Sequence, residues 1–321
     1  MFLILILLSL FIKPSAIVTV DQEKAISNQQ LIKPNEDEIV VAVIDSGIDE
    51  TNTKLKKIFW HNPLDNTVGI NTTGFSKSIS DENGHGTHIA GIISGVLDKE
   101  YYSQIKVMVI KGISMNYVGE QSYGRSFTEA FQFAIDHNAK IINLSFGGYS
   151  FMQKEYDAIK KAKEKGILVI TAAGNEDHKI SNKDMDSYYP ASYQLDNIIS
   201  VGAINEDNEK LPMSNYGKSV NVSAIGQNIR SYCLRSRICW KNGTSQATAN
   251  VTRIAARLLA RNPSLKYKEL KSLILKSSTY NPKLKELNSI SGEVDEESAI
   301  RLLTVENQKK ISINRKVASE S

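Results

Sequence analysis

The chain has 321 residues, 41% of them hydrophobic, which is ordinary for a globular protein and enough for one large domain or two small ones. Its 39 basic and 35 acidic residues are interspersed and give a net charge of only +4. This balance argues against nucleic acid as a partner, because nucleic-acid binding needs a concentrated basic surface.

The amino terminus carries an apolar run over residues 2–12. The run is too short to cross a bilayer but suits the core of a signal peptide. With Ser15 and Ala16 as small residues at a cleavage site, we expect a signal peptide over residues 1–16, export of the protein, and no stable membrane span after removal of the leader. An uncleaved anchor remains the alternative, since Pro14 adjoins the cleavage site.

Cysteine occurs only at Cys233 and Cys239. An even pair in an exported protein is readily oxidised, so a disulfide that closes a short loop is one interpretation. Two unpaired structural thiols are the other interpretation, and the sequence leaves both open.

The first strong element is a largely β-branched run over residues 39–44, which is typical of a strand buried on both faces of a parallel sheet. Similar patterns predict strands over residues 105–110, 141–145, 167–173, 198–201 and 220–223. Helical periodicity predicts helices over residues 89–96, 127–137, 155–165, 246–261, 267–276 and 296–303. The alternation predicts an α/β fold with one doubly wound, mostly parallel sheet flanked by helices.

A single domain over residues 38–304 accounts for this alternation. Residues 17–37 are polar and too few to fold as a domain, and residues 305–321 form a polar, basic tail. Within the domain, residues 50–82 are rich in Asn, Thr, Ser and Gly, so we expect a long surface excursion there.

Two polar side chains mark the first half of the domain. Asp45 directly follows the first strand, and in open α/β sheets functional groups gather at the carboxyl ends of strands. A structural Asp that caps a turn is the alternative. His85 lies between glycines at a helix start, where its imidazole is free to reach across a cleft. A metal site at His85 and His88 would need further ligands, and the chain has neither an HExxH motif nor a Cys cluster.

Ser245 lies where a Gly-led turn meets the helix predicted over residues 246–261, near the positive end of the helix dipole. Alone, such a serine is more often an N-cap. A serine nucleophile needs a base to take its proton and a third group to orient that base, and His85 and Asp45 supply both. The order Asp, His, Ser is one of the known arrangements of the hydrolytic triad.

On these residues the sequence resembles the subtilisin-like serine proteases, or subtilases. Five co-linear motifs carry the resemblance, namely DSG at 45–47, GHGTHIAG at 84–91, NLSFGG at 143–148, AAGNE at 172–176 and GTSQAT at 243–248. The resemblance covers roughly residues 38–304 and implies the doubly wound fold and a serine endopeptidase activity.

The resemblance implies a role for each matching residue. Ser245 would be the nucleophile, His85 the general base, Asp45 the group that orients His85, and Asn175 the side-chain donor to the oxyanion. Residues implied to flank the pocket for the substrate residue before the cut are Ser145, Phe146, Gly147, Ala172, Ala173 and Gly174, with Tyr188 at its floor. A left-handed turn residue is the alternative for Asn175, and a side chain that points outward is the alternative for Tyr188.

Three departures from the family pattern stand out. Gln246, Ala249 and Asn250 replace the family's Met, Pro and His after the serine. Lys54 stands where a calcium-ligating Asp is common, so we expect no calcium, no other metal and no cofactor. The segment 17–37 is shorter than the family's folding propeptide, which implies folding unaided or with a partner.

The sequence therefore predicts an exported, monomeric serine endopeptidase whose partners are protein or peptide substrates. The alternative is a catalytically inactive subtilisin-like domain kept for binding, which the altered serine motif favours. The presence of all three triad side chains and of Asn175 favours the enzyme.

Overall fold

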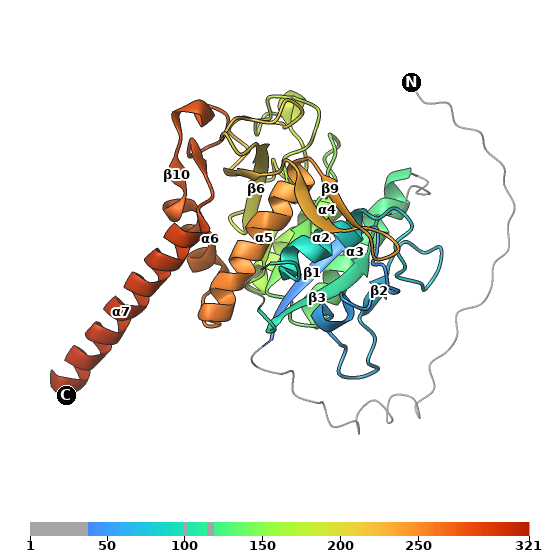
Figure 1. Cartoon of the computed structure of the whole chain (residues 1–321). Helices are drawn as coiled ribbons and strands as arrows, with labels where there is room; N and C mark the ends of the chain where they lie inside the picture. Colours follow the sequence, from blue (N-terminus) through green and yellow to red (C-terminus); the bar gives the residue numbers. More distant parts are fainter. Residues whose placement is uncertain (1–37, 99–101, 114–118, 321) are drawn as a thin grey trace, which may run out of the picture.

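The computed structural model describes residues 38–98, 102–113 and 119–320 (Figure 1). The signal peptide predicted over residues 1–16 and the polar segment 17–37 lie outside the described residues. In the described ranges, no helix combines the length and apolar character needed to span a bilayer.

A nine-stranded sheet forms the centre of the molecule, in the order β10-β11-β7-β6-β5-β4-β1-β3-β2. The strands are β1 Ile39–Asp45, β2 Gly69–Asn71, β3 Ile105–Lys111, β4 Ile141–Leu144, β5 Leu168–Ala172, β6 Ile198–Ile204, β7 Val222–Ile225, β10 Thr279–Tyr280 and β11 Gly292–Glu293. All neighbouring pairs are parallel except β10 and β11. The predicted α/β fold with a doubly wound, mostly parallel sheet is confirmed.

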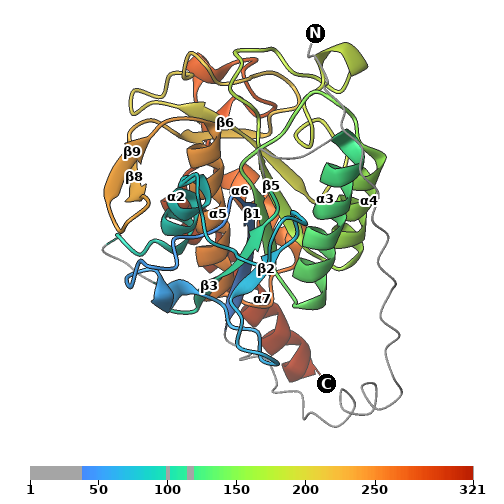
Figure 2. The same cartoon turned by 90° about the vertical axis from the view of Figure 1, so that its right-hand side faces the viewer.

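Helices cover both faces of this sheet, which is why β1 is apolar throughout. Val41 and Val43 of β1 pack into a core with α2 (His85–Ser94) and α5 (Thr244–Arg261). Val40, Ala42 and Ile44 pack into a second core with α3 (Gly119–Asp136) and α4 (Gln153–Glu164). Figure 2 shows the two helix layers on opposite sides of the sheet. Because side chains alternate along a strand, burial on both faces requires a continuous apolar run.

The carboxyl-terminal helix is longer than predicted. After α6 (Tyr267–Ser277), α7 runs over Glu296–Glu320, so the prediction of a short helix that ends at Leu303 is wrong. Ala299 and Leu303 are buried in the core, whereas the later turns extend away from the body (Figure 1). The chain contains no Gly or Pro between Glu296 and Glu320 to end the helix.

The segment 50–82 is more structured than a surface excursion. It contains a short 3₁₀ turn at Lys56–Ile58 and the edge strand β2, and it buries Leu55, Ile58 and Trp60. Irregularly spaced apolar residues anchor the segment, and such spacing carries no helical or strand period to detect.

Four helices start earlier than predicted. They begin at His85 (α2), Gly119 (α3), Gln153 (α4) and Thr244 (α5).

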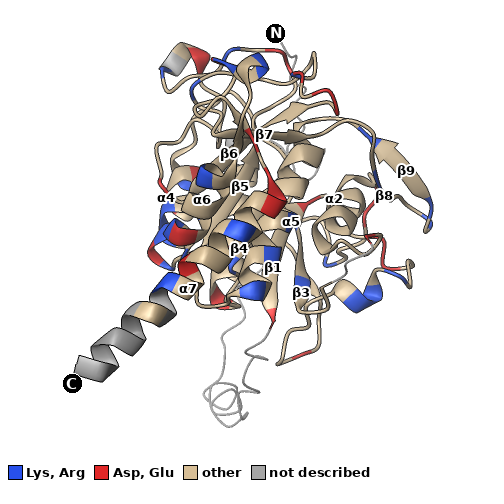
Figure 3. Ribbon diagram, turned by 60° about the vertical axis from the view of Figure 1, so that its left-hand side comes forward, with Lys and Arg blue, Asp and Glu red and all other residues tan. Residues whose placement is uncertain are grey.

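A two-stranded hairpin, β8 (Ile229–Tyr232) and β9 (Ile238–Lys241), stands apart from the main sheet. Cys233 and Cys239 are joined by a disulfide at its tip, with Cα atoms 5.9 Å apart. Of the two interpretations of the cysteine pair, the structure has the disulfide. Figure 3 shows basic and acidic residues interspersed along the ribbon rather than gathered in one region.

Candidate active site

The predicted catalytic residues gather at the carboxyl ends of β1 and β4. These strands are neighbours in register, with Ile44 opposite Leu144, so Asp45 and Ser145 follow side by side. Ser245 Oγ donates a hydrogen bond to the Ser145 carbonyl at 2.9 Å, and Ser145 Oγ donates to the Ser245 carbonyl at 3.1 Å. Strand β3 lies on one side of β1 and β4 on the other, so the strand order reverses at this point. Such a topological switch point is where open α/β sheets place their ligand-binding and active sites.

His85, the first residue of α2, is held by Asp45. The distance from His85 Nδ1 to Asp45 Oδ1 is 2.8 Å, and the side chains are 28% and 5% exposed. Burial alone would lower the pKa of His85, but the charge of Asp45 and its hydrogen bond raise that pKa above the ordinary value. With Nδ1–H donating to the carboxylate, Nε2 is left with the lone pair that a general base needs.

A second set of bonds fixes the start of α2. Ser46 Oγ donates to Asp81 Oδ1 at 2.9 Å and accepts from the Gly86 N–H at 2.9 Å. Asp81 Oδ2 accepts from the N–H and the hydroxyl of Thr87 at 2.9 and 2.6 Å. A Cβ at Gly86 would lie 2.3 Å from the Gly47 carbonyl oxygen, so only glycine allows this approach. The glycine-rich motif thus serves to bring His85 against Asp45.

A buried polar chain ties α5 to β4 and positions Ser245. Thr252 Oγ1 donates to Asn143 Oδ1 at 2.8 Å, and Asn143 Nδ2 donates to Ser145 Oγ at 2.9 Å. Since all three side chains are buried, each would be costly to leave unpaired. The α5 helix is continuous from Thr244 through Asn250, so the residues that depart from the family pattern leave the helix intact.

Asn175 lies beside the start of α5. Its Oδ1 accepts hydrogen bonds from the Thr244 N–H at 2.9 Å and the Thr244 hydroxyl at 3.1 Å. The oxygen is therefore engaged with the helix, and the exposed side chain has its amide N–H groups directed elsewhere. The Ser245 N–H, in the first turn of α5, has no intrahelical acceptor. N–H donors of both Asn175 and Ser245 are thus available next to Ser245 Oγ.

Tyr188 fills the space between the two segments predicted to flank the substrate pocket. A Cβ at Gly147 would lie 2.5 Å from Tyr188 Cε1, and a Cβ at Gly174 would lie 2.8 Å from Tyr188 Cζ. Tyr188 as a whole is only 6% exposed. Ser145 directly follows β4, and Ala172 is the last residue of β5. These strands pair Leu144 with Thr171, and Ala173 is buried next to them.

Phe146, also predicted to flank the pocket, packs differently. Its ring meets Phe127 of α3 edge-on, with centroids 6.4 Å apart. We therefore place Phe146 at the boundary between the site and the α3 core.

Two charged residues near the site were given no role by sequence reasoning. Glu176 Oε2 accepts from Asn215 Nδ2 at 2.8 Å and would lie 2.7 Å from a Cβ at Gly174. Lys241 Nζ donates to the Gly84 carbonyl at 3.1 Å. Glu176 is the last residue of the AAGNE motif, and Lys241 lies two residues before the GTSQAT motif, so proximity to a motif was the available signal.

His88 and Lys54 are residues that the sequence analysis considered for metal binding. His88 is fully buried, and burial lowers its pKa to about 4. Within residues 38–98, 102–113 and 119–320, no group of three or more His, Cys, Asp or Glu side chains is placed to hold a metal. Lys54 is exposed, and its N–H donates to Asn52 Oδ1 at 3.0 Å. The expected lack of a calcium site stays a prediction.

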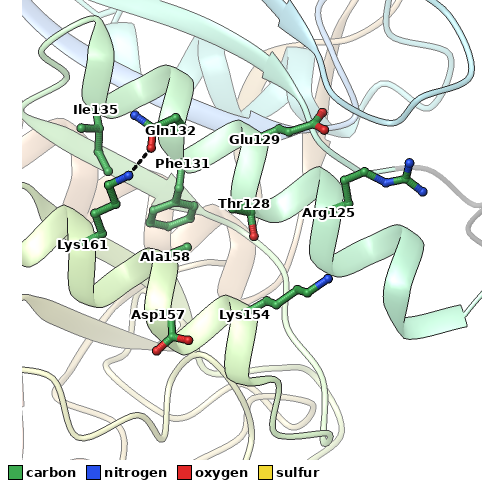
Figure 4. Close-up of a pocket in the computed structure, with 10 residues that line it drawn as sticks. All are labelled: Arg125, Thr128, Glu129, Phe131, Gln132, Ile135, Lys154, Asp157, Ala158 and Lys161. Carbon is green, nitrogen blue, oxygen red and sulfur yellow. Dashed lines mark hydrogen bonds between the residues drawn. The ribbon is translucent and has the colours of Figure 1, made fainter. Parts of the chain in front are cut away.

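A groove of about 660 Å³ lies elsewhere, between α3 and α4 (Figure 4). Phe131, Ile135 and Ala158 contribute its apolar surface, and Lys161 Nζ donates to Gln132 Oε1 at one end. None of the predicted site residues lines it. The groove is therefore separate from the candidate active site.

Comparison with known proteins matches residues 36–294 to the model described as the subtilase family. The chain is 32% identical to the cell wall-associated protease of Bacillus subtilis (strain 168), over 78% of this chain and 27% of that protein. It is 32% identical to the minor extracellular protease Epr of the same strain, over 70% of this chain and 33% of that protein. It is 30% identical to the thermostable alkaline protease of Halalkalibacterium halodurans, over 75% of this chain and 62% of that protein. The chain thus spans between 27% and 62% of the length of these relatives.

A solved structure, described as the structural basis of subtilase cytotoxin SubAB assembly, has a similar fold. It superposes with a TM-score of 0.70 at 22% identity, over 84% of this chain and 91% of that chain. At this identity the likeness shows the fold alone.

Proposed function

This chain belongs to the subtilase family, and from that premise we propose that it is an exported serine endopeptidase whose triad is Asp45, His85 and Ser245. The observation that carries the proposal is the contact of 2.8 Å between His85 Nδ1 and Asp45 Oδ1 at the carboxyl ends of the central strands. At the same end of the sheet, Ser245 Oγ donates a hydrogen bond to the Ser145 carbonyl. Three different elements supply the three groups that the reaction needs: α5 the nucleophile, α2 the base with a free ring nitrogen, and β1 the carboxylate that orients the base.

In the proposed reaction, Ser245 Oγ turns from the Ser145 carbonyl toward His85, a rotation about one side-chain bond. Hydrogen bonds in a free active site commonly tighten only when substrate binds. Oγ then attacks the scissile carbonyl carbon while His85 Nε2 takes its proton, and Asp45 stabilises the imidazolium that forms.

The tetrahedral intermediate carries a negative charge on the former carbonyl oxygen. Asn175 Nδ2–H and the Ser245 N–H are proposed to donate to this oxygen. His85 next gives its proton to the leaving amine, which breaks the C–N bond and leaves an acyl group on Ser245. A water molecule then repeats the sequence, with His85 as base, and releases the acid product.

Export is part of the proposal. The relatives named as cell wall-associated and extracellular proteases support it, as does the disulfide between Cys233 and Cys239, since disulfides persist in oxidising compartments. The apolar leader over residues 2–12 is the third support.

Labelling with a fluorophosphonate probe tests the function directly. Wild-type protein is expected to label at Ser245 and to hydrolyse peptides, because the probe reacts only with an activated serine. Ser245→Ala should not label, and Ser264→Ala, at an exposed serine beyond α5, should label like wild type. Folded wild-type protein that stays unlabelled and hydrolyses nothing would favour the inactive binding domain instead.

Tyr188 is proposed to limit the residue before the cleaved bond to small or medium side chains. Its ring occupies the space between Gly147 and Gly174 that a bulky aromatic would enter. In peptides varied at that position, wild type should prefer Ala or Leu to Phe, and Tyr188→Gly should raise kcat/KM for Phe by about 30-fold, since burying such a side chain yields about 2 kcal/mol.

Tyr188→Phe is the matched control, because it keeps the ring and removes the hydroxyl. It should retain the wild-type preference. The proposal is wrong if wild type already prefers Phe, or if Tyr188→Gly gains nothing for it.

A further inference from the structure

Lys241 ends the β8–β9 hairpin four residues before Ser245, on the side of His85. Its Nζ donates to the carbonyl of Gly84, the residue before His85, at 3.1 Å. The ammonium carries three N–H donors, so this single bond leaves it capable of binding another acceptor. Lys241 therefore presents a positive charge at the start of α2.

This charge has no carboxylate of its own. Of the ion pairs within 4.0 Å that the described part of the chain forms, none includes Lys241. The nearby Asp45 is paired with His85, and Asp81 is bonded to Ser46 and Thr87. Lys241 is half-buried, and this burial lowers its pKa although Asp81 and Asp45 act to raise it. A half-buried cation that forms no ion pair of its own favours binding an anion.

The position of the leaving group in the proposed reaction determines which part of a peptide substrate lies near Lys241. His85 must give its proton to the leaving amine, so the residue after the cleaved bond has to lie on the His85 side. The acyl half lies on the opposite side, toward Ser145 and Gly174 after β4 and β5. The hairpin runs along α2, since Ser231 Oγ donates to the His88 carbonyl at 2.7 Å (Figure 2).

The hairpin holds Lys241 in a fixed place. Lys241 pairs with Ile229 in the β8–β9 register, and the disulfide closes the other end of the hairpin. A Cβ at Gly84 would lie 3.1 Å from Leu234 Cγ, so the hairpin tip also packs against the start of α2. The cation and the catalytic histidine thus share one framework.

We propose that Lys241 binds the side-chain carboxylate of the residue immediately after the cleaved bond, so that the enzyme prefers Glu or Asp at that position. This inference rests on the proposed peptidase function. It names a substrate class for the leaving-group half of the site, whereas Tyr188 concerns the acyl half.

The test uses the full chain and three peptides that differ only in the residue after the cleaved bond, which is Glu, Gln or Lys. For wild type at low ionic strength, kcat/KM for Glu should exceed that for Gln by about fivefold, with Lys lowest. Lys241→Gln should bring the Glu to Gln ratio close to one, and Lys241→Arg should retain it. Raised salt should reduce the wild-type ratio.

Arg230→Gln is the matched control. Arg230 is an exposed cation of the same hairpin that pairs with Trp240, so its side chain lies on the face opposite to Lys241. This variant should keep the wild-type ratio. Titration with the fluorophosphonate gives the active fraction of each preparation, so that ratios compare folded enzyme only.

Equal wild-type rates for the three peptides, or a Glu preference that survives in Lys241→Gln, would overturn the inference while leaving the peptidase function intact. A wild-type protein that cleaves no peptide and takes no label would overturn the function and the inference together.

Discussion

Ser245→Ala and His85→Ala are each expected to lower kcat for peptide hydrolysis by about four to six orders of magnitude. Each change removes a whole step of the proposed reaction. Without Ser245 no acyl group can form on the protein, and without His85 no group takes the serine proton or returns it to the leaving amine. The 2.8 Å distance from His85 Nδ1 to Asp45 Oδ1 means that the imidazole is already held by the carboxylate in the free protein, as the proposed reaction requires.

The double variant distinguishes a triad from two independent contributions. Because the residues act as a unit, the double variant should be about as slow as either single variant. His61→Ala, at an exposed histidine outside the site, is the control and should retain wild-type kcat. Rates are measured with one peptide at saturation. A His85→Ala variant that kept most of its activity would contradict the assignment of the base.

Much of the fold could be predicted because burial on both faces leaves a clear pattern. The run from Ile39 to Ile44 is apolar at every position, and each position enters one of two cores. The motifs around Asp45, His85 and Ser245 are local sequences with fixed spacing, so their positions could be read without the fold. What brings them together is strand order, which the alternation of elements constrains strongly.

Elements that depend on distant partners could not be predicted. Strand β2 has three residues and exists because Gly69–Asn71 pairs with β3. The β8–β9 hairpin is half exposed, and no sequence period shows that it lies along α2. The contact between Lys241 and the Gly84 carbonyl joins residues 157 positions apart, so only the structure shows that a cation adjoins the base.

The side-chain bonds of the site were also beyond sequence reasoning. The hydrogen bond from Ser245 Oγ to the Ser145 carbonyl depends on the side-chain rotamer of Ser245, which the sequence motif does not specify. The extent of α7 was missed because Glu296–Glu320 carries polar residues on most positions after Leu303, where composition favours a tail as much as a helix.

Asn175→Ala is expected to lower kcat by about 10²–10³-fold while KM stays within about threefold. The proposed donor bond forms only when the carbonyl oxygen becomes an oxyanion, so its loss destabilises the transition state and not the bound substrate. The variant also removes the oxygen that accepts from Thr244, at 2.9 Å to its N–H. A second variant must therefore separate donation from positioning.

Asn175→Asp makes that separation. Its carboxylate can still accept from the Thr244 N–H and hydroxyl, but it has no N–H to donate, and its negative charge would repel the oxyanion. If Asn175 acts as a donor, Asn175→Asp should be as slow as Asn175→Ala or slower, with KM again little changed. If Asn175 only holds Thr244 and the start of α5, Asn175→Asp should recover most of the wild-type kcat. Steady-state kinetics with one peptide, corrected by active-site titration, decide between the two roles, and recovery by Asn175→Asp would remove Asn175 from the oxyanion hole.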